Sequence, residues 1–396
     1  MLRRIKPIFG NLALLGGSLL ACFAALEYGL FKYVLIPDDV IHNVTINNVV
    51  RYRPNTRAVF REPDGSQNLI TVNADGWNST KPRYKVEKTP GVLRVAVVGD
   101  SYVHGASVDV DKSFAHVIEQ QLNARGIRAE VYRFGVDGAP LSQYLHMLRR
   151  EVIRYKPDVV LFQLIHNDFD ESYRFLFGRY ASSFLKVRPK ESGGFTEVAP
   201  EEFVPGFADF ARGFRTFRYL YYETELHTKI RHIVNRVWWG GEAVASTKEM
   251  ISSAVDIRNI QDQDTIWDVS HYVLRQIKYM ATAYDFKPAF VMDGVREAVY
   301  SGEDRKTYEV AELNEIAAEL TEELDLPFVD MQDVFAAHYR KHKTRFEFTW
   351  DWHWNELANR LVGETAVSLL LDDPRLLGTK QPARVSENRR ATITLP

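Results

Sequence analysis

From residue 93 onward, short apolar runs alternate with amphipathic stretches, and this alternation constrains the fold more than any other feature of the chain. The run Asp158–Leu164 is apolar almost throughout, which is typical of a strand buried on both faces. Alternating strands and helices predict a parallel sheet covered by helices, in an α/β fold. The predicted strands are Arg94–Val98, Ala129–Phe134, Asp158–Leu164, Pro288–Met292 and Pro327–Asp330, and the predicted helices are 111–124, Leu141–Tyr155, 268–284, 304–324 and Asn355–Leu371.

The rest of the chain differs in character from this alternating region. Residues 169–265 are rich in aromatic residues and arginine. We expect them to form a helical insertion that packs on the body, or else a cap that shapes the site or rests on a membrane. Short strands are expected at Arg51–Asn55 and Leu69–Asn73, followed by a turn at Asp75-Gly76. The predicted segments are a signal anchor at 1–37, an extended entry segment and linker at 38–92, a main domain at 93–372 and a disordered tail at 373–396.

The amino terminus has the pattern of a membrane-spanning helix. Positive residues precede Ile8–Leu26, which is nineteen residues long and carries no charge. As a helix it would span about 28 Å, close to the thickness of one hydrocarbon core. The positive flank indicates that the amino terminus stays in the cytoplasm. We therefore predict a single-pass helix in a bacterial inner (cytoplasmic) membrane, with the remaining chain on the periplasmic side.

Two other interpretations of this segment stay open. Leu19–Cys22 is similar to the lipobox of a lipoprotein signal, although the chain remains apolar beyond Cys22. A cleaved signal peptide is the third interpretation, but no small-residue cleavage site follows a short apolar core. We favour the uncleaved anchor.

Composition narrows the classes of function. The chain is 45% hydrophobic and 26% charged, which is ordinary for a globular protein. A net charge of −2 and the lack of a nucleic-acid motif give no reason to expect nucleic acid as a partner. Cys22 is the single cysteine, so neither an intramolecular disulfide nor a cysteine-based zinc site can form. We expect no metal and no cofactor.

A serine follows the first predicted strand of the alternating region. Gly99, Asp100 and Ser101 form a tight turn just past Val98 and lead toward the next helix. Ligands of open parallel sheets bind at the carboxyl ends of the strands. A serine in this turn can be exposed, and the nearby backbone N–H groups can bind an oxyanion. An ordinary glycine-containing turn is the alternative.

Chemically useful residues also follow other predicted strands. Gly135 and Gly138 lie in the turn after the second strand, where a backbone N–H can face a ligand. Asn167 follows the third strand, and its side-chain amide can donate to an oxyanion. His353 precedes the last helix and suits a general base, while Asp351 can orient its ring. Because these residues all lie at strand exits or before the last helix, we expect them to form one site.

These motifs resemble those of the SGNH (GDSL-like) hydrolase superfamily. Gly99–Tyr102 is similar to its first block, Gly135–Gly138 to its second, Asn167-Asp168 to its third, and Asp351 with His353 to its last. The resemblance implies a three-layer α/β/α flavodoxin-like sandwich with about five parallel strands. It also implies Ser101 as the nucleophile, His353 as the base and Asp351 as its partner. An oxyanion hole would use the Ser101 N–H, a glycine N–H and Asn167; we prefer Gly138, which lies nearer the helix.

The resemblance also bears on the substrate. The sequence of residues 51–110 and the Asp-x-His-Trp pattern at Asp351 are similar to those of membrane-anchored proteins of exopolysaccharide modification, such as the alginate O-acetylation proteins. We therefore expect an esterase or O-acetyltransferase acting on acyl, chiefly acetyl, esters of a cell-envelope or extracellular polysaccharide. Trp352 and Trp354 flank His353 and are expected to bind substrate by stacking on sugar rings, with ordinary packing as the alternative.

Other functions stay possible at this stage. A non-catalytic glycan-binding or assembly subunit of a polysaccharide export system would keep the fold without the chemistry. A lipid esterase would also fit the anchor and the aromatic insertion. The expected partners are the membrane, through the amino-terminal helix, an acylated polysaccharide and a polysaccharide-synthesis complex.

Overall fold

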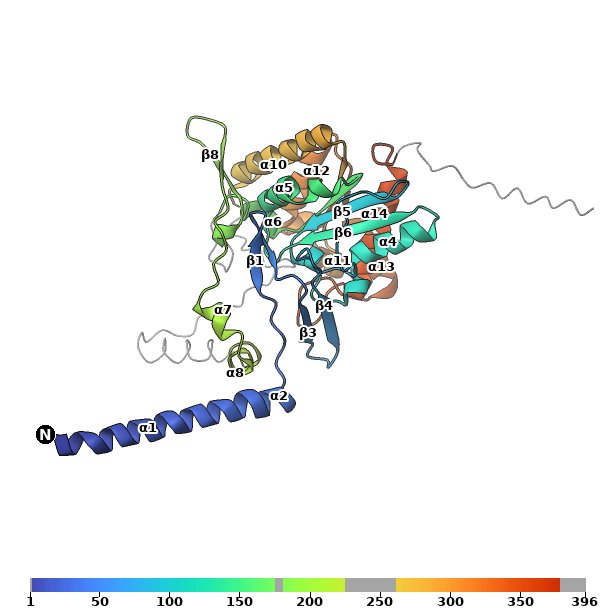
Figure 1. Ribbon diagram of the computed structural model, residues 1–396. Coiled ribbons are helices and arrows are strands. Elements are labelled where there is room, and N and C mark those ends of the chain that lie inside the picture. Colours follow the sequence, from blue (N-terminus) through green and yellow to red (C-terminus); the bar gives the residue numbers. More distant parts are fainter. Residues whose placement is uncertain (1, 175–180, 225–260, 378–396) are drawn as a thin grey trace, which may run out of the picture.

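A five-stranded parallel sheet forms the centre of the molecule (Figure 1). The computed structural model describes residues 2–174, 181–224 and 261–377. The strands are β5 (Leu93–Gly99), β6 (Ala129–Gly135), β7 (Val159–Leu164), β10 (Lys287–Met292) and β11 (Phe328–Asp330), in the order β11-β10-β7-β5-β6. All neighbouring pairs are parallel. The predicted α/β fold and its five strands are confirmed.

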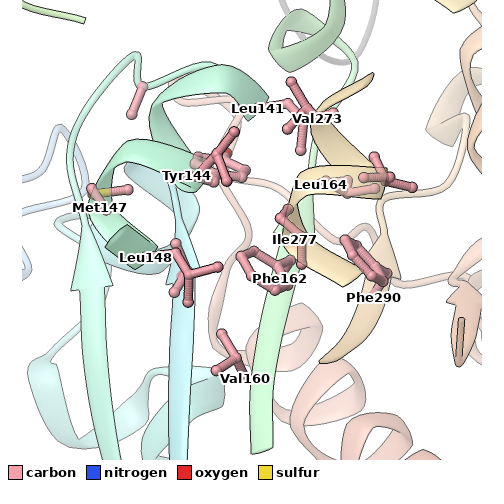
Figure 2. Close-up of a cluster of buried hydrophobic side chains, with 14 of the residues drawn as sticks. Leu141, Tyr144, Met147, Leu148, Val160, Phe162, Leu164, Val273, Ile277 and Phe290 are labelled. Carbon is pink, nitrogen blue, oxygen red and sulfur yellow. The ribbon is translucent and has the colours of Figure 1, made fainter. Parts of the chain in front are cut away.

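Alternate residues of each strand enter cores on opposite faces of the sheet. Val98 and Phe162 lie in the core under α5 (Leu141–Arg150), α10 (Gln263–Tyr284) and α12 (Ala311–Glu323). Val97 and Leu161 lie in the other core, under α4 (Phe114–Ala124) and α14 (Glu356–Asp372). The helices therefore form two layers around the sheet. Figure 2 shows the first core, where helical Leu141, Tyr144, Leu148, Val273 and Ile277 meet Val160, Phe162 and Phe290 of the strands.

The helices begin where the sequence offers a cap. The Asn355 side chain accepts a hydrogen bond from the Ala358 N–H at 3.1 Å, so α14 starts at the predicted position. Ser113 caps α4, and the predicted helix near 111 is instead a 3₁₀ turn, η2 (Val110–Lys112), followed by α4. The remaining short elements are α3 (Ser101–His104), η3 (Val152–Tyr155), α6 (Asn167–Asp170), α11 (Arg296–Ser301), η7 (Arg305–Thr307) and α13 (Gln332–His342).

The entry segment folds into two antiparallel hairpins that join the main body. The pairs are β1 (Asn43–Ile46) with β2 (Val49–Tyr52), and β3 (Arg57–Arg61) with β4 (Gln67–Thr71). Trp77 and Tyr84 are buried in the main core, and Arg51 makes a buried ion pair with Glu151 at 2.8 Å. The segment is thus packed into the domain, whereas a linker was expected across its second half.

The described part of the insertion contains strands as well as helices. It includes η4 (Ala181–Ser183), the hairpin β8 (Lys186–Pro189) and β9 (Phe195–Val198), α7 (Phe207–Ala211), α8 (Arg215–Arg218) and a π-helical turn, η5 (Tyr219–Glu223). The expectation of a purely helical insertion misses the hairpin. Residues 175–180 and 225–260 of this insertion, and 378–396 of the predicted tail, lie outside the described residues.

The amino terminus forms one long helix that projects from the body (Figure 1). It comprises α1 (Leu2–Ala25), η1 (Leu26–Leu30) and α2 (Phe31–Tyr33). Within the described residues, Gly10–Tyr33 is the one helical stretch long and apolar enough to cross a membrane. A signal sequence near an amino terminus can meet the same criteria of length and hydropathy, so the helix fits an anchor as well as a signal sequence.

The order of the strands determines where a ligand can bind. The chain passes from β5 outward to β6 and then returns to β7 on the other side of β5. Crevices of open α/β sheets form at such a reversal, outside the carboxyl ends of the two strands concerned. Ser101 follows β5 and Asn167 follows β7. Both residues therefore lie at the predicted edge of the sheet.

Candidate active site

Three of the predicted site residues form an unbroken chain of hydrogen bonds. Ser101 Oγ lies 2.7 Å from His353 Nε2, and His353 Nδ1 lies 2.6 Å from Asp351 Oδ1. Residues 252 positions apart in the sequence are thus brought into contact. A serine, an imidazole and a carboxylate in this order have the geometry of an activated nucleophile and its base.

The carboxylate is itself held by a second serine. Ser107 Oγ donates to Asp351 Oδ2, while Asp351 Oδ1 faces the ring and the backbone N–H of His353. Both oxygens of the carboxylate therefore have partners, which fixes the plane of the carboxylate and, through it, the imidazole. Ser107 was not among the site residues predicted from the sequence.

A buried arginine clamps the loop that carries Asp351 and His353. Arg296 donates to the Trp352 carbonyl at 2.7 Å and to Tyr102 Oη at 2.9 Å, and Tyr102 Oη donates to the same carbonyl at 3.0 Å. Asp293 and Glu347 balance the arginine charge, each at 3.3 Å. The clamp therefore joins the turn of the nucleophile to the loop of the base.

Trp354 is a core residue, contrary to the expectation that it binds substrate. Its side chain is 2% exposed, its Nε1 donates to Asp293 at 3.0 Å, and its ring meets Tyr102 and Phe114 edge to face. No face of the indole is left for a sugar. Trp352 is partly buried, and its carbonyl accepts the two hydrogen bonds of the clamp.

The nucleophile lies at the start of a one-turn helix. Asp100 caps α3 by accepting from the Tyr102 N–H at 2.9 Å, which leaves the Ser101 N–H without an intrahelical partner. Gly135, at the end of β6, packs directly on this turn, since a Cβ there would lie 2.2 Å from the His104 nitrogen. The glycine of the second block is thus required for close packing beneath the serine.

The entry segment supports the same turn from outside. Asn73 accepts hydrogen bonds from the N–H groups of Asp75 and Trp77, which builds the predicted turn. Asn78 then donates to the His104 carbonyl at 2.8 Å. Residues 73–78 therefore act on the position of the serine turn through the carboxyl end of α3.

The two further oxyanion donors predicted from the sequence follow the strands on either side of β5. Gly138 is in the loop after β6 and has a φ of +68°, in the left-handed region that favours glycine. Asn167 begins α6 directly after β7, and its side chain makes a hydrogen bond with Glu171. Their use as oxyanion donors stays a prediction.

The electrostatics of the site favour an ion pair. Burial lowers the pKa of His353, but the hydrogen bond and the charge of Asp351 outweigh it, so this pKa lies above its ordinary value of 6.5. Burial raises the pKa of Asp351, but His353 and Ser107 together lower it to about 2. Asp351 therefore stays ionised and stabilises the imidazolium that forms when His353 accepts a proton.

These pKa shifts predict opposite effects of pH on activity and stability. The base must be neutral, so kcat/KM should fall as the pH drops through the raised pKa of His353, above 6.5. The raised pKa in turn stabilises the folded state below pH 6.5, and this contribution is lost as the pH rises through the folded-state value. Asp351→Asn should shift the acid limb of the rate profile to lower pH. Rate profiles and thermal melts of both proteins test this, and an unshifted limb in the variant would contradict it.

A pocket of about 390 Å³ opens beside the serine turn. His104 and Ala106 line it from the chain just after the nucleophile, and Asp137 lines it from the loop that holds Gly138. The entry segment supplies the opposite side, and Arg212 and Arg218 of the insertion also line it. His104 Nδ1 lies 2.6 Å from Asp137 Oδ1, which fixes the ring on this side of the pocket. Among the described residues no group of three histidine, cysteine or acidic side chains is placed to hold a metal ion.

Comparisons with known proteins agree with the geometry at the level of the family. The model of the family described as GDSL-like Lipase/Acylhydrolase matches residues 95–366. No curated protein sequence matches the chain.

Among solved structures, the chain is similar to an acetyl xylan esterase, with 14% identity over 70% of this chain and 100% of that chain and a TM-score of 0.40. It is also similar to an alpha/beta hydrolase enzyme from the metagenome of Lake Arreo, Spain, at 11% identity, 70% and 94% coverage and a TM-score of 0.38. A third similar structure is a catalytic mutant of an acetylxylan esterase from Geobacillus stearothermophilus, with 10% identity over 70% of this chain and 93% of that chain and a TM-score of 0.38. These values are too low to indicate a substrate.

Proposed function

The chain belongs to the GDSL-like lipase/acylhydrolase family, and we propose that it is a membrane-anchored esterase or O-acyltransferase of an envelope polysaccharide. In this proposal Ser101, His353 and Asp351 form the catalytic triad, and acetyl is the group cleaved or transferred. The observation that carries the catalytic part is the continuous chain of hydrogen bonds from Ser101 to Asp351.

The chemistry would proceed through an acyl-enzyme. His353 Nε2 takes the proton of Ser101 Oγ as that oxygen attacks the ester carbonyl carbon. The negative charge on the carbonyl oxygen is stabilised by the N–H groups of Ser101 and Gly138 and by the Asn167 amide. His353 then donates its proton to the departing alcohol, which leaves the acyl group on Ser101.

The second step decides between the two activities. Water attacks the acyl-enzyme in an esterase, whereas a sugar hydroxyl attacks it in a transferase. In both cases His353 removes the proton of the attacking group and gives it to Ser101 Oγ, as the bond between that oxygen and the acyl carbon breaks. The pocket beside the turn is large enough for a sugar unit near the acyl group. The apolar helix Gly10–Tyr33 supports the membrane location.

The proposed substrate class can be tested with the full-length protein in detergent. We expect release of acetate from an acetylated polysaccharide, or transfer of acetyl from p-nitrophenyl acetate to the unacetylated polymer. Phosphatidylcholine should yield far less fatty acid, because the charged side chains of Asp38, Asp39, Asp137, Arg212 and Arg218 line the pocket and disfavour a long acyl chain. Ser101→Ala is the matched control for uncatalysed hydrolysis.

The outcomes separate the competing functions. Fatty-acid release that exceeds acetate release would replace the proposal by a lipid esterase. A wild-type protein that neither turns over an ester nor is labelled at Ser101 by a fluorophosphonate would be a binding or assembly subunit.

A further inference from the structure

Part of the insertion is attached to the amino-terminal helix at a level inside the candidate membrane span. Glu27 lies within Gly10–Tyr33, yet its carboxylate is buried and caps the start of α8. It accepts hydrogen bonds from the Arg215 N–H at 2.9 Å, from the Thr216 N–H at 2.8 Å and from the Thr216 hydroxyl at 3.0 Å. An acidic residue in an apolar span is costly unless it is paired, and here the insertion supplies its partners.

Aromatic contacts extend this attachment along the helix. The ring of Phe23 meets Phe214 edge to face at 5.6 Å, and Phe31 lies 4.7 Å from the ring of Tyr219. Phe23 lies three residues before the end of the uncharged stretch Ile8–Leu26, about 5 Å at 1.5 Å per residue, and Glu27 directly follows that stretch. Whatever contacts Phe23 and Glu27 must therefore lie at the boundary of the hydrocarbon core, wherever the helix spans a membrane.

The same part of the insertion exposes large apolar side chains. Phe207 is 83% exposed, Val204 is 76% exposed and Phe210 is 66% exposed. Phe210 packs edge to face on Phe214, so this surface is continuous with the contact to Phe23. Exposed apolar groups gathered in one segment mark an interaction surface. Figure 1 shows α7 and α8 between the sheet and the amino-terminal helix.

We infer that residues 204–221 are a membrane-seated segment whose apolar side chains lie in the lipid interface beside the anchor. The occupant of this surface is the lipid bilayer, since the surface continues that of an apolar helix long enough to span one. Arg215, whose side chain is partly exposed, lies at the same level and suits the lipid phosphates. This inference rests on the membrane anchoring in the proposed function and adds a second contact with the bilayer.

The segment also connects the membrane to the pocket. Arg218, in α8, donates to the Asp38 carbonyl at 2.7 Å and pairs with Asp39 at 3.5 Å. All three residues line the pocket beside the serine turn. Lipid contact at one end of the segment would thus hold the pocket at a fixed height above the membrane, within reach of a polymer at its surface.

Spin labels in the full chain test the inference. The native cysteine is first removed as Cys22→Ser. Single cysteines are then introduced as Leu20→Cys in the span, Phe207→Cys in the segment and Tyr279→Cys at an exposed position of α10. The protein is placed in vesicles of phosphatidylethanolamine and phosphatidylglycerol. We expect labels at 20 and 207 to collide several-fold more often with oxygen than with a water-soluble nickel complex, and the label at 279 to show the reverse.

The results distinguish the inference from the proposed anchoring. If the label at 20 collides mainly with oxygen while the label at 207 collides with the nickel complex as often as the label at 279 does, the inference is wrong and the membrane anchor is still supported. A label at 20 in water would overturn both. Val204→Cys provides a second position in case Phe207→Cys fails to fold, as judged by thermal melting. The label at position 204 should lose its preference for oxygen when Phe207→Asp and Phe210→Asp are added to the same protein.

Discussion

Ser101→Ala and His353→Ala should each lower kcat for an acetyl ester by about 10⁶-fold, because each removes a group that the other needs. The double variant should be scarcely worse than either single variant, since the nucleophile and its base act as one unit. Ester hydrolysis by the purified full-length proteins measures this. The Ser101→Ala protein should also resist a fluorophosphonate that labels the unaltered serine.

Two further variants complete the test. Asn167→Ala should cost about 10²–10³-fold in kcat, the usual scale for one oxyanion donor. Ser192→Ala, in the exposed turn of the β8–β9 hairpin, is the matched serine control and should keep full activity. All five variants should melt at nearly the same temperature as the unaltered protein. Ser101→Ala with parental activity and an unchanged melt would disprove the assignment of the nucleophile.

Trp354→Ala should destabilise the protein by about 3–5 kcal/mol, the range for removing a large aromatic side chain from a core. The indole fills the space between Tyr102 and Phe114, and its loss also deprives the buried Asp293 carboxylate of a donor. Denaturant unfolding measures the change. Activity should fall as well, since Trp354 immediately follows His353.

The neighbouring Trp350 offers the matched control. It lies on the surface, where its Nε1 donates to Glu62, so Trp350→Ala should change the free energy of unfolding far less. Equal losses in the two variants would show that Trp354 does not anchor the core. A stable Trp354→Ala protein with weakened substrate binding would restore the original expectation of a sugar-stacking residue.

The sequence predicted those features that depend on local pattern. The central strands β5 and β7 are short apolar runs with several valines, and Asn355 is a cap that any helix would use. Ser101 and Asn167 could be placed because parallel strands end at one edge of a sheet. The hydrogen bond between Ser101 and His353 agrees with that prediction, because His353 lies in the polar stretch that leads into the last helix.

Contacts between distant residues carry no local signal and were missed. Ser107 reaches Asp351 across 244 positions, and no spacing in either stretch indicates it. Arg296 could have been predicted as a site residue, because Asp293 and Arg296 follow β10 at the same edge of the sheet. The bounds of α13 were not predicted, because only Phe335 along it is buried, which leaves a weak periodicity.

The error at Trp354 has a simple geometric cause. Consecutive side chains of a non-helical segment can point to opposite sides, so His353 faces Ser101 while the next residue along faces the core. Trp354 pairs with Glu347 in an isolated β-bridge. A tryptophan beside a predicted base was therefore interpreted as a ligand contact, although the alternation directs it into the core.

The hydrogen bonds between Glu27 and the start of α8 bear on whether the amino-terminal helix could be replaced by another membrane anchor. A helix that only held the protein at a membrane could be exchanged for another apolar helix. Here a foreign helix without an acidic residue at this position would leave the N–H groups of Arg215 and Thr216 without their acceptor. Proteolytic removal of residues 1–27 would have the same effect, because it would remove Glu27. The amino-terminal helix is thus a component of the tertiary fold, and a truncated soluble form would lack the group that organises α8.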